Sequence, residues 1–293
     1  MNMETRVAAQ TPVFGEGALT SLRAAYPETP CRLDHEMRDH PLLSFEALGK
    51  LALSMREVDV EYNRADLPVG IDPVDIPDNG LGIAETLENI ESNDSWMVLK
   101  FIEQNATYKA LLHETLAEIE PAVRAVTGEM MKLEGFIFVS SPGAVTPFHM
   151  DPEHNILLQL RGSKVMTVFP VGDDDLTPGT AHEAFHAGGH RNLDWRDEFA
   201  ARGEPFELAP GQAIYVPVKA PHWVQNGPGT SVSLSITWQS EWAYHEMYAR
   251  EMNALLRRCG LNPAAPKRFP HPNRAKSFAW RAIDKARRMA GRN

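Results

Sequence analysis

The chain has 293 residues, of which 43% are hydrophobic and 23% are charged, which predicts a globular protein with room for a sizeable core. No apolar run approaches the length of a membrane span and the N-terminus lacks the apolar segment of a signal peptide, so we expect no membrane association. The only cysteines, Cys31 and Cys259, argue against a disulfide framework or a zinc knuckle and predict a cytoplasmic location.

The first 130 residues predict a helical and irregular support region. Residues 1–40 carry little periodicity and are expected to be irregular. Residues 41–54 predict a helix with Ser44 as its N-cap. Residues 64–80 are rich in Pro and Gly and predict a loop.

A second helical stretch is expected in the same region. Residues 83–90 are helical in pattern, and Asn105 could cap a longer helix, with Pro121 starting a new turn and Gly128 ending the region. The longer helix shows one apolar stripe, formed by Leu111, Leu112, Leu116 and Ile119.

Residues 131–240 change from helical to alternating periodicity. Gly162 and Ser163 suit a tight hairpin turn, and residues 172–204 interrupt the pattern as a long insert. Short strands separated by turn residues favour a sandwich or barrel over a parallel α/β sheet, so the fold class is mainly β with flanking helices (α+β). The expected strands cover 135–139, 154–161, 163–170, 212–217 and 231–238.

Residues 241–293 predict a C-terminal helical region with a basic tail. A helix over 241–258 ends near Gly260. Residues 267–293 hold nine Lys/Arg and one acid, so this tail carries +8 and the rest of the chain −18. Such a tail could contact nucleic acid or an acidic partner. We favour a helix docked on its own body or on another subunit, since three apolar side chains could hold it there: Phe278, Trp280 and Ile283.

Three residues carry the strongest chemical signal: His149, Asp151 and His222. In a strand, residues two apart point to the same side, so His149 and Asp151 can hold one ion together. Two imidazoles and one carboxylate on one face of a metal leave the opposite face open, as a non-haem Fe(II) oxygenase requires. A His-x-Asp tripeptide alone is also compatible with an ordinary surface loop.

Lys164 adds to this signal. Strand alternation places it on one face with Met166 and Val168, where an unpaired ammonium would be costly. The far carboxylate of 2-oxoglutarate would be a suitable partner, and Thr146 could donate a further hydrogen bond. The alternative is a lysine that reaches solvent from a half-buried strand.

Residues 146–164, with the sequence TPFHMDPEHNILLQLRGSK, and the block from Gly211 to Trp238 resemble the Jumonji-C (cupin-like) 2-oxoglutarate oxygenases. The resemblance covers about residues 134–240 and is nearest in motif to the branch that contains the hypoxia-inducible-factor asparaginyl hydroxylase. It implies a double-stranded β-helix, or jelly roll, whose strands bring the three ligands to one mouth.

The resemblance also implies roles for individual residues. Fe(II) would be bound by His149, Asp151 and His222. The tail of the cosubstrate 2-oxoglutarate would be held by Lys164 and Thr146, with Asn155 beside it. The pocket would be lined by Phe138 and Trp238. The family's Asn two residues before the matching Trp is Ile236 here.

The implied activity is an Fe(II)- and 2-oxoglutarate-dependent dioxygenase that hydroxylates a protein side chain or a small molecule. No catalytic residue beyond the metal ligands is expected. The family further implies a homodimer through the C-terminal helices, and a nucleic-acid partner is not expected. One alternative is a non-catalytic cupin-like protein that binds a metal or ligand for regulation; another is a cupin-type dioxygenase or isomerase that does not use 2-oxoglutarate.

The insert contains histidines at every fourth residue, His182, His186 and His190. On a helix they could bind a second metal, although Gly188 and Gly189 would break it before His190. We therefore favour a lid or substrate-contacting loop. Residues 193–199 could form a rim over the pocket, or a solvated helix with its aromatic side chains packed inward. His154 lies five residues after His149, so strand parity places it on the opposite face, away from the ion.

Overall fold

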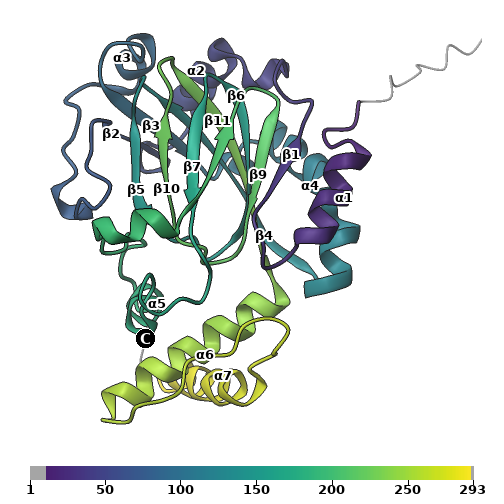
Figure 1. Cartoon of the computed structure of the whole chain (residues 1–293), viewed down its shortest axis with the longest axis vertical. Helices are drawn as coiled ribbons and strands as arrows, with labels where there is room; N and C mark the ends of the chain where they lie inside the picture. Colours follow the sequence, from purple (N-terminus) through teal and green to yellow (C-terminus); the bar gives the residue numbers. More distant parts are fainter. Residues whose placement is uncertain (1–10, 292–293) are drawn as a thin grey trace, which may run out of the picture.

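A computed structural model describes residues 11–291 of the chain. Two antiparallel β-sheets form its core, helices cover the outer face of the larger sheet, and a pair of C-terminal helices projects from one end (Figure 1). The predicted fold class, mainly β with flanking helices in a jelly-roll arrangement, is confirmed. Among the described residues, no helix combines the length and apolarity needed to cross a membrane.

The larger sheet has seven strands in the order β1-β9-β6-β11-β4-β3-β2. Their bounds are β1 Cys31–Asp34, β2 Val60–Arg64, β3 Ser95–Lys100, β4 Met130–Ser140, β6 His154–Arg161, β9 Gln212–Val216 and β11 Ser231–Ser240. The smaller sheet has four strands in the order β5-β10-β7-β8. They are β5 Val145–His149, β7 Lys164–Val168, β8 Glu204–Leu208 and β10 His222–Asn226.

Four helices from the first half of the chain support the larger sheet: α1 Glu16–Ala25, α2 Phe45–Ser54, α3 Ile83–Glu88 and α4 Ala106–Thr127. The predicted caps are confirmed, because the Ser44 hydroxyl accepts from the Ala47 amide and the Asn105 side chain accepts from the Thr107 amide. Pro121, in contrast, lies inside α4 and does not begin a new element. The expectation that residues 1–40 are irregular was wrong where the structure describes them, since they contain α1 and β1.

Alternation along the strands of the larger sheet produces two apolar cores. One face of each strand packs against α1, α2 and α4, and the other faces the smaller sheet. On β6, for example, Ile156 and Leu158 belong to the helix-side core, whereas Leu157 packs against Met166 and Val168 of β7.

The turn at Gly162 differs from the prediction. Its φ of +63° suits a tight turn, but β6 and β7 belong to different sheets and do not form a hairpin. An added Cβ would lie 2.4 Å from the Thr230 carbonyl oxygen, so the position requires glycine. The turn carries the chain from the larger to the smaller sheet, which is how Lys164 comes to line the space between them.

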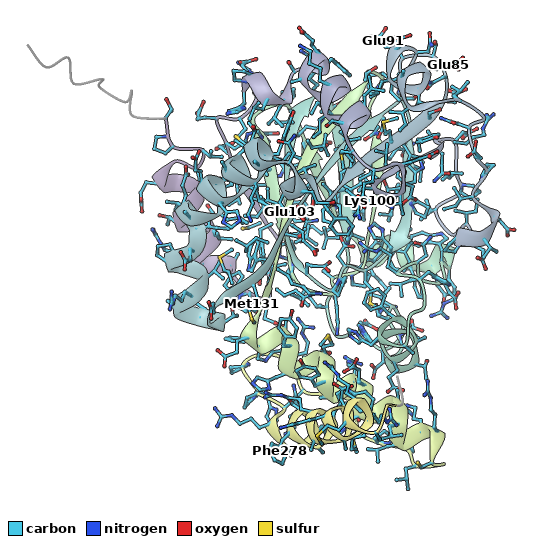
Figure 2. All side chains as sticks on the ribbon, turned by 180° about the vertical axis from the view of Figure 1, so that it is seen from behind. Glu85, Glu91, Lys100, Glu103, Met131 and Phe278 are labelled. Atoms are coloured by element: carbon cyan, nitrogen blue, oxygen red, sulfur yellow. The ribbon has the colours of Figure 1, made fainter. Side chains whose placement is uncertain are left out.

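The remaining helices are α5 Gly179–His186 in the insert, α6 Glu241–Arg258 and α7 Arg274–Met289. Short 3-10 helices cover Pro41–Leu43, Glu57–Asp59, Pro73–Asp75, Ile102–Gln104 and Asp197–Arg202. The C-terminal helix packs against α6, so the predicted docking on the protein's own body is confirmed. Phe278 was expected to contribute to this docking but is 76% exposed, at the end of the molecule far from Glu85 and Glu91 (Figure 2).

Candidate metal centre

His149 and His222 face each other across neighbouring strands. His149 ends β5 and His222 begins β10, and the two residues are direct partners in the antiparallel register. Side chains of such a pair point to the same face of the sheet, and the two ring centroids lie 4.2 Å apart. Asp151 follows two residues after His149, so the jelly roll brings all three predicted ligands to one end of the smaller sheet.

The hydrogen bonds of both imidazoles leave the same nitrogen available. His149 Nδ1 lies 2.6 Å from the Pro147 carbonyl oxygen, and His222 Nδ1 lies 2.9 Å from the Ala220 carbonyl oxygen. A carbonyl can only accept, so each Nδ1–H donates and each Nε2 keeps its lone pair free. Metal-binding histidines are fixed in this way by an acceptor behind the ring.

The three side chains are close enough to share one ion. Asp151 Oδ1 lies 4.0 Å from His149 Nε2, and Asp151 Oδ2 lies 3.6 Å from His222 Nε2. All three ligand atoms lie within 4.8 Å of one another. Adjacent ligand atoms around a six-coordinate transition metal are roughly 3 Å apart, so small rotations of these side chains suffice. The donor set fits a divalent iron.

Arg191, from the insert, lies against the carboxylate of this cluster. Its Nη1 donates to Asp151 Oδ1 at 2.6 Å, and its carbonyl accepts from the Met150 amide. Burial alone would raise the pKa of Asp151, but the guanidinium and the two imidazoles hold this pKa below its usual range. Burial, reinforced by His222, lowers the pKa of His149. The Asp151 carboxylate is therefore anionic and the His149 imidazole neutral, which are the protonation states that a metal ligand requires.

Lys164 lies on the inter-sheet face, as predicted, with Met166 and Val168 of the same strand in the apolar cluster there. It is only 6% exposed, and within the described residues its ammonium has neither a hydrogen bond nor an ion pair. Burial lowers its pKa to about 7. An unpaired buried ammonium is costly, so this position favours a carboxylate ligand.

Three further predicted residues share that face. Thr146 of β5 is the register partner of Val224, which packs between the sheets, and Phe138 of β4 packs against the same cluster. Asn155 of β6 is 5% exposed and accepts a hydrogen bond from the Ser235 hydroxyl at 2.8 Å. Asn155 and Phe138 therefore border the space between the metal cluster and Lys164, whereas Thr146 is exposed on β5.

The predicted pocket role of Trp238 was wrong. Trp238 is fully buried on the helix side of β11, where it stacks with Tyr26 and His154 at centroid distances of 6.3 and 5.3 Å. Ile236 lies on that same side. The residue of β11 that points toward Asn155 is Ser235, and the spacing of the motif did not predict it.

His154 occupies the opposite face from Asn155, as strand parity predicted, but it is completely buried. Its Nδ1 lies 2.9 Å from the Tyr215 hydroxyl, and its Nε2 lies 3.1 Å from the Ser240 hydroxyl. The residue is part of the support behind the larger sheet and does not reach the ion.

The insert packs over the outer side of the metal cluster. Trp195 and Phe199 contact Phe148 of β5, at ring centroid distances of 5.3 and 6.3 Å. His182 and His186 lie on α5, which ends before Gly188 as predicted, and His190 is exposed. Within residues 11–291 the only His, Cys, Asp and Glu cluster spaced for a metal is the one at His149.

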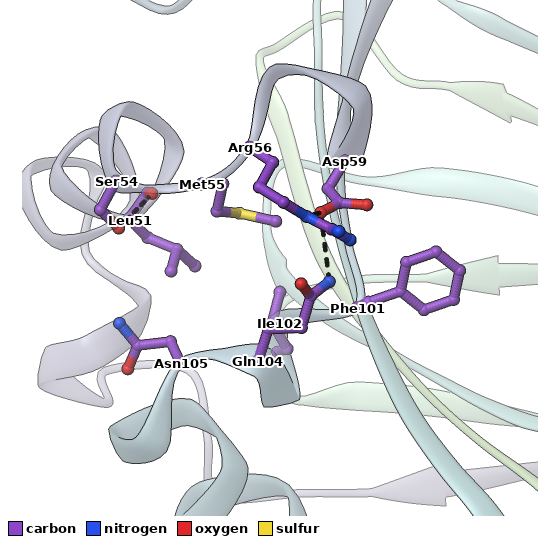
Figure 3. A pocket seen from close by; sticks show the side chains of 9 residues that line it. All are labelled: Leu51, Ser54, Met55, Arg56, Asp59, Phe101, Ile102, Gln104 and Asn105. Carbon is purple, nitrogen blue, oxygen red and sulfur yellow. Dashed lines mark hydrogen bonds and ion pairs between the residues drawn. The ribbon is translucent and has the colours of Figure 1, made fainter.

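Two cavities lie elsewhere on the molecule. One of about 320 Å³ lies between α2 and the start of α4, where Arg56 and Gln104 both donate to Asp59 (Figure 3). The Asp59 carboxylate is thereby paired within the protein. The other, of about 470 Å³, reaches Lys164 and Asn226 at the end of β7 and β10 away from the metal cluster.

Curated proteins and solved structures both match parts of this chain. A curated relative, Jumonji C domain-containing protein 5 of Drosophila melanogaster, is 31% identical over 111 residues, which are 33% of this chain and 25% of that protein. Lysine-specific demethylase JMJ30 of Arabidopsis thaliana is 32% identical over 121 residues, covering 39% of this chain and 27% of the relative. The chain thus spans about a quarter of the length of these relatives. No family model matches.

Among solved structures, ycfD of Escherichia coli matches over 92% of this chain and 67% of its own, with a TM-score of 0.51 and 17% identity. At that identity the match establishes the fold. Together with the curated relatives it confirms the resemblance of the core to Jumonji-C proteins.

Proposed function

Starting from the Jumonji-C character of this core, we propose that the chain is an Fe(II)- and 2-oxoglutarate-dependent oxygenase. The observation that carries the proposal is the convergence of His149, Asp151 and His222, with both imidazole Nε2 atoms free and the carboxylate ionised. Bound iron would supply the activation of O₂ and the two-electron oxidation of a C–H bond, which no side chain can perform.

The residues of the chain would bind, orient and shield the reactants. Lys164 would form a charge-assisted hydrogen bond with the far carboxylate of 2-oxoglutarate, and Thr146 would add a hydroxyl donor. Asn155 borders the cosubstrate, and Phe138 keeps water from its apolar stem. None of these groups needs to act as an acid or a base, so we assign no catalytic residue beyond the metal ligands.

We propose a basic or polar protein side chain as the substrate, with a small molecule as the alternative. Two curated relatives bear the name lysine-specific demethylase and match this chain at 32% and 28% identity. Thr237 of β11 is the register partner of both Glu134 on β4 and Asn155 on β6, so Glu134 lies at the same level of the sheet as Asn155. Burial, together with Asp151, raises the pKa of the nearby Glu153 to about 7. These acids border the metal cluster on the sheet side, where their oxygens can accept hydrogen bonds from a basic or polar group.

Three further assignments belong to the proposal. The chain would be organised as a support region, 1–130, a catalytic core, 131–240, and a C-terminal helical region, 241–293. It would act in the cytoplasm as a homodimer joined through the C-terminal helices. A nucleic-acid partner is not part of the proposal.

Succinate formation from 2-oxoglutarate tests the activity. The purified protein, given Fe(II), ascorbate and 2-oxoglutarate, should release succinate, and the His149→Ala variant should not. A folded protein that binds iron through the triad but produces no succinate, alone or with basic peptides, would favour the non-catalytic alternative. Turnover of another substrate that is unaffected by Lys164→Ala would favour an oxygenase or isomerase independent of 2-oxoglutarate.

A further inference from the structure

The segment just before His222 touches two of the three metal-cluster residues. The Lys219 amide donates to the Asp151 carbonyl at 2.7 Å, and the Ala220 carbonyl accepts from His222 Nδ1 at 2.9 Å. One dipeptide therefore fixes both the backbone that carries the carboxylate and the rotation of an imidazole.

Lys219 adopts an unfavourable backbone conformation. Its φ is +59°, in the left-handed region that residues with a Cβ rarely adopt. Such a conformation persists where the surrounding structure fixes it. The contacts of the Lys219 side chain therefore become important, because they hold the residue in place.

The side chain of Lys219 extends away from the metal cluster and is bound by two helices. Its Nζ donates to the Glu246 carboxylate of α6 and lies 3.0 Å from His186 Nε2 of α5. Glu246 also accepts from Arg250 Nε at 2.6 Å. All of these side chains except that of His186 are less than 10% exposed, so the ion pair is shielded from solvent.

Burial makes the ion pair between Lys219 and Glu246 difficult to break. A buried ion pair contributes little net stability relative to apolar residues, but loss of one partner leaves an uncompensated charge. The Lys219 ammonium therefore cannot leave Glu246 without a large penalty. The position of α6, outside the β-core, is thereby transmitted to the loop that holds Asp151 and His222.

We propose that Lys219 is a positioning residue, through which Glu246 of α6 sets the spacing of Asp151 and His222 for metal binding. The inference rests on the proposed metal site and assigns a role in it to the C-terminal helical region. Removal of a partner that orients a metal ligand typically lowers metal affinity about 10- to 100-fold.

Co(II) binding to the full chain tests this role, with calorimetry for affinity and the visible absorption of the bound ion for geometry. Lys219→Met should weaken Co(II) binding by about tenfold or more and alter the absorption bands. In this variant Glu246 still pairs with Arg250, so the protein should fold without a lone buried ion and still bind Co(II) weakly. Urea unfolding of each metal-free protein reports whether it is folded.

Glu183→Gln is the matched control. Glu183 of α5 pairs with Arg257 of α6 at 2.9 Å, so this change breaks an ion pair between the same two helices without touching the metal loop. It should leave Co(II) affinity and spectrum unchanged. Wild-type affinity and spectrum in Lys219→Met, or an equal loss in Glu183→Gln, would overturn the inference. Co(II) binding that survives His149→Ala would instead show that the ion is not at the triad, and the proposed function would fail first.

Discussion

Asp151 Oδ2 lies 3.6 Å from His222 Nε2, although one residue follows β5 and the other begins β10. The two strands are direct neighbours in the smaller sheet, so the contact is a consequence of the jelly-roll topology. His149 completes the group as the register partner of His222. Substitution of any of these three side chains should therefore lower metal affinity more than it lowers the free energy of unfolding.

Asp151→Ala should abolish stoichiometric binding of Fe(II) or Co(II) while the metal-free protein remains folded. The substitution removes one of three ligands, whereas the Arg191 side chain that it leaves unpaired is 48% exposed and can be solvated. Metal content per chain and the urea unfolding midpoint of the metal-free protein measure the two effects. Asp175→Ala, which breaks exposed pairs with Arg196 and Arg202 in the same insert, is the control and should bind metal normally.

Lys164 predicts that 2-oxoglutarate binding depends on pH. Burial lowers the pKa of its ammonium to about 7, whereas a bound carboxylate favours the charged form. Above pH 7 the free protein loses this proton and must regain it on binding. The affinity for 2-oxoglutarate of the metal-loaded protein should therefore fall by up to about tenfold per pH unit between 7 and 9. Calorimetry in buffers of different ionisation enthalpy would detect the proton uptake.

Two variants test the contribution of the Lys164 charge to 2-oxoglutarate binding. Lys164→Arg keeps a positive charge throughout this range, so it should flatten the pH dependence. Lys164→Met should weaken 2-oxoglutarate binding at all these pH values, since the charge-assisted bond is lost. A titration that is identical in Lys164→Met and in the unsubstituted protein would contradict the assignment.

The local sequence pattern was sufficient to predict those features that depend on a single short-range rule. The spacing of His149 and Asp151, the shared face of Lys164 and Met166, and the cap at Ser44 each depend on a few neighbouring residues. All three agree with the structure. The fold class also followed from alternating segments separated by turns.

The sequence pattern was insufficient to predict those features that depend on which strands pair with each other. All ten residues of β11 are buried, so alternation there cannot show which face borders the pocket, and Trp238 was placed on the wrong one. Gly162 has the left-handed backbone of a tight turn both in a hairpin and in a crossing between sheets. Strand β10 has only five residues and was not predicted, although it begins with a metal-cluster residue.

The corrected orientation of Trp238 can be tested against Phe138. Trp238→Phe should lower the free energy of unfolding by about 1–3 kcal/mol, because it leaves space in a fully buried stack, with little change in 2-oxoglutarate affinity. Phe138→Ala should weaken cosubstrate binding severalfold, because Phe138 borders the inter-sheet space. Urea unfolding and calorimetry measure the two quantities. The reverse pattern would restore Trp238 to the pocket.

A homodimer through the C-terminal helices predicts a change in mass. Phe278 and Met289 of α7 are 76% and 75% exposed, and an interface between two copies would bury such apolar side chains. Light scattering should give twice the chain mass for the unsubstituted protein and the mass of one chain for Phe278→Glu. Leu53→Glu, which changes an exposed apolar residue of α2, should remain dimeric. A single-chain mass for the unsubstituted protein would exclude this proposal.

Buried imidazoles predict that the metal-free protein loses stability in mild acid. Burial lowers the pKa of His149, His154, His182 and His186, to between about 2 and about 3. The corresponding unfolded pKa is about 6.5, so below that pH the unfolded chain binds protons that the folded protein does not. Each such site should remove up to about 1.4 kcal/mol of stability per pH unit as the pH falls from 6.5 toward 5.

Among the carboxyl groups whose pKa burial raises, Glu153 acts most strongly in the opposite direction. Burial raises the pKa of Glu153 to about 7, so the folded state gains this proton and offsets roughly one of the four imidazoles. Urea unfolding between pH 7 and 5 should therefore show a net loss of stability as the pH falls, with a slope to which His35 and His40 also contribute, because burial lowers their pKa values too. His182→Gln should make it shallower by about one proton, because His182 is 3% exposed and lies on α5 against buried cations. His113→Gln, at an exposed position of α4, should leave it unchanged, and a slope that does not differ between these two variants would show that His182 is protonated in the folded protein.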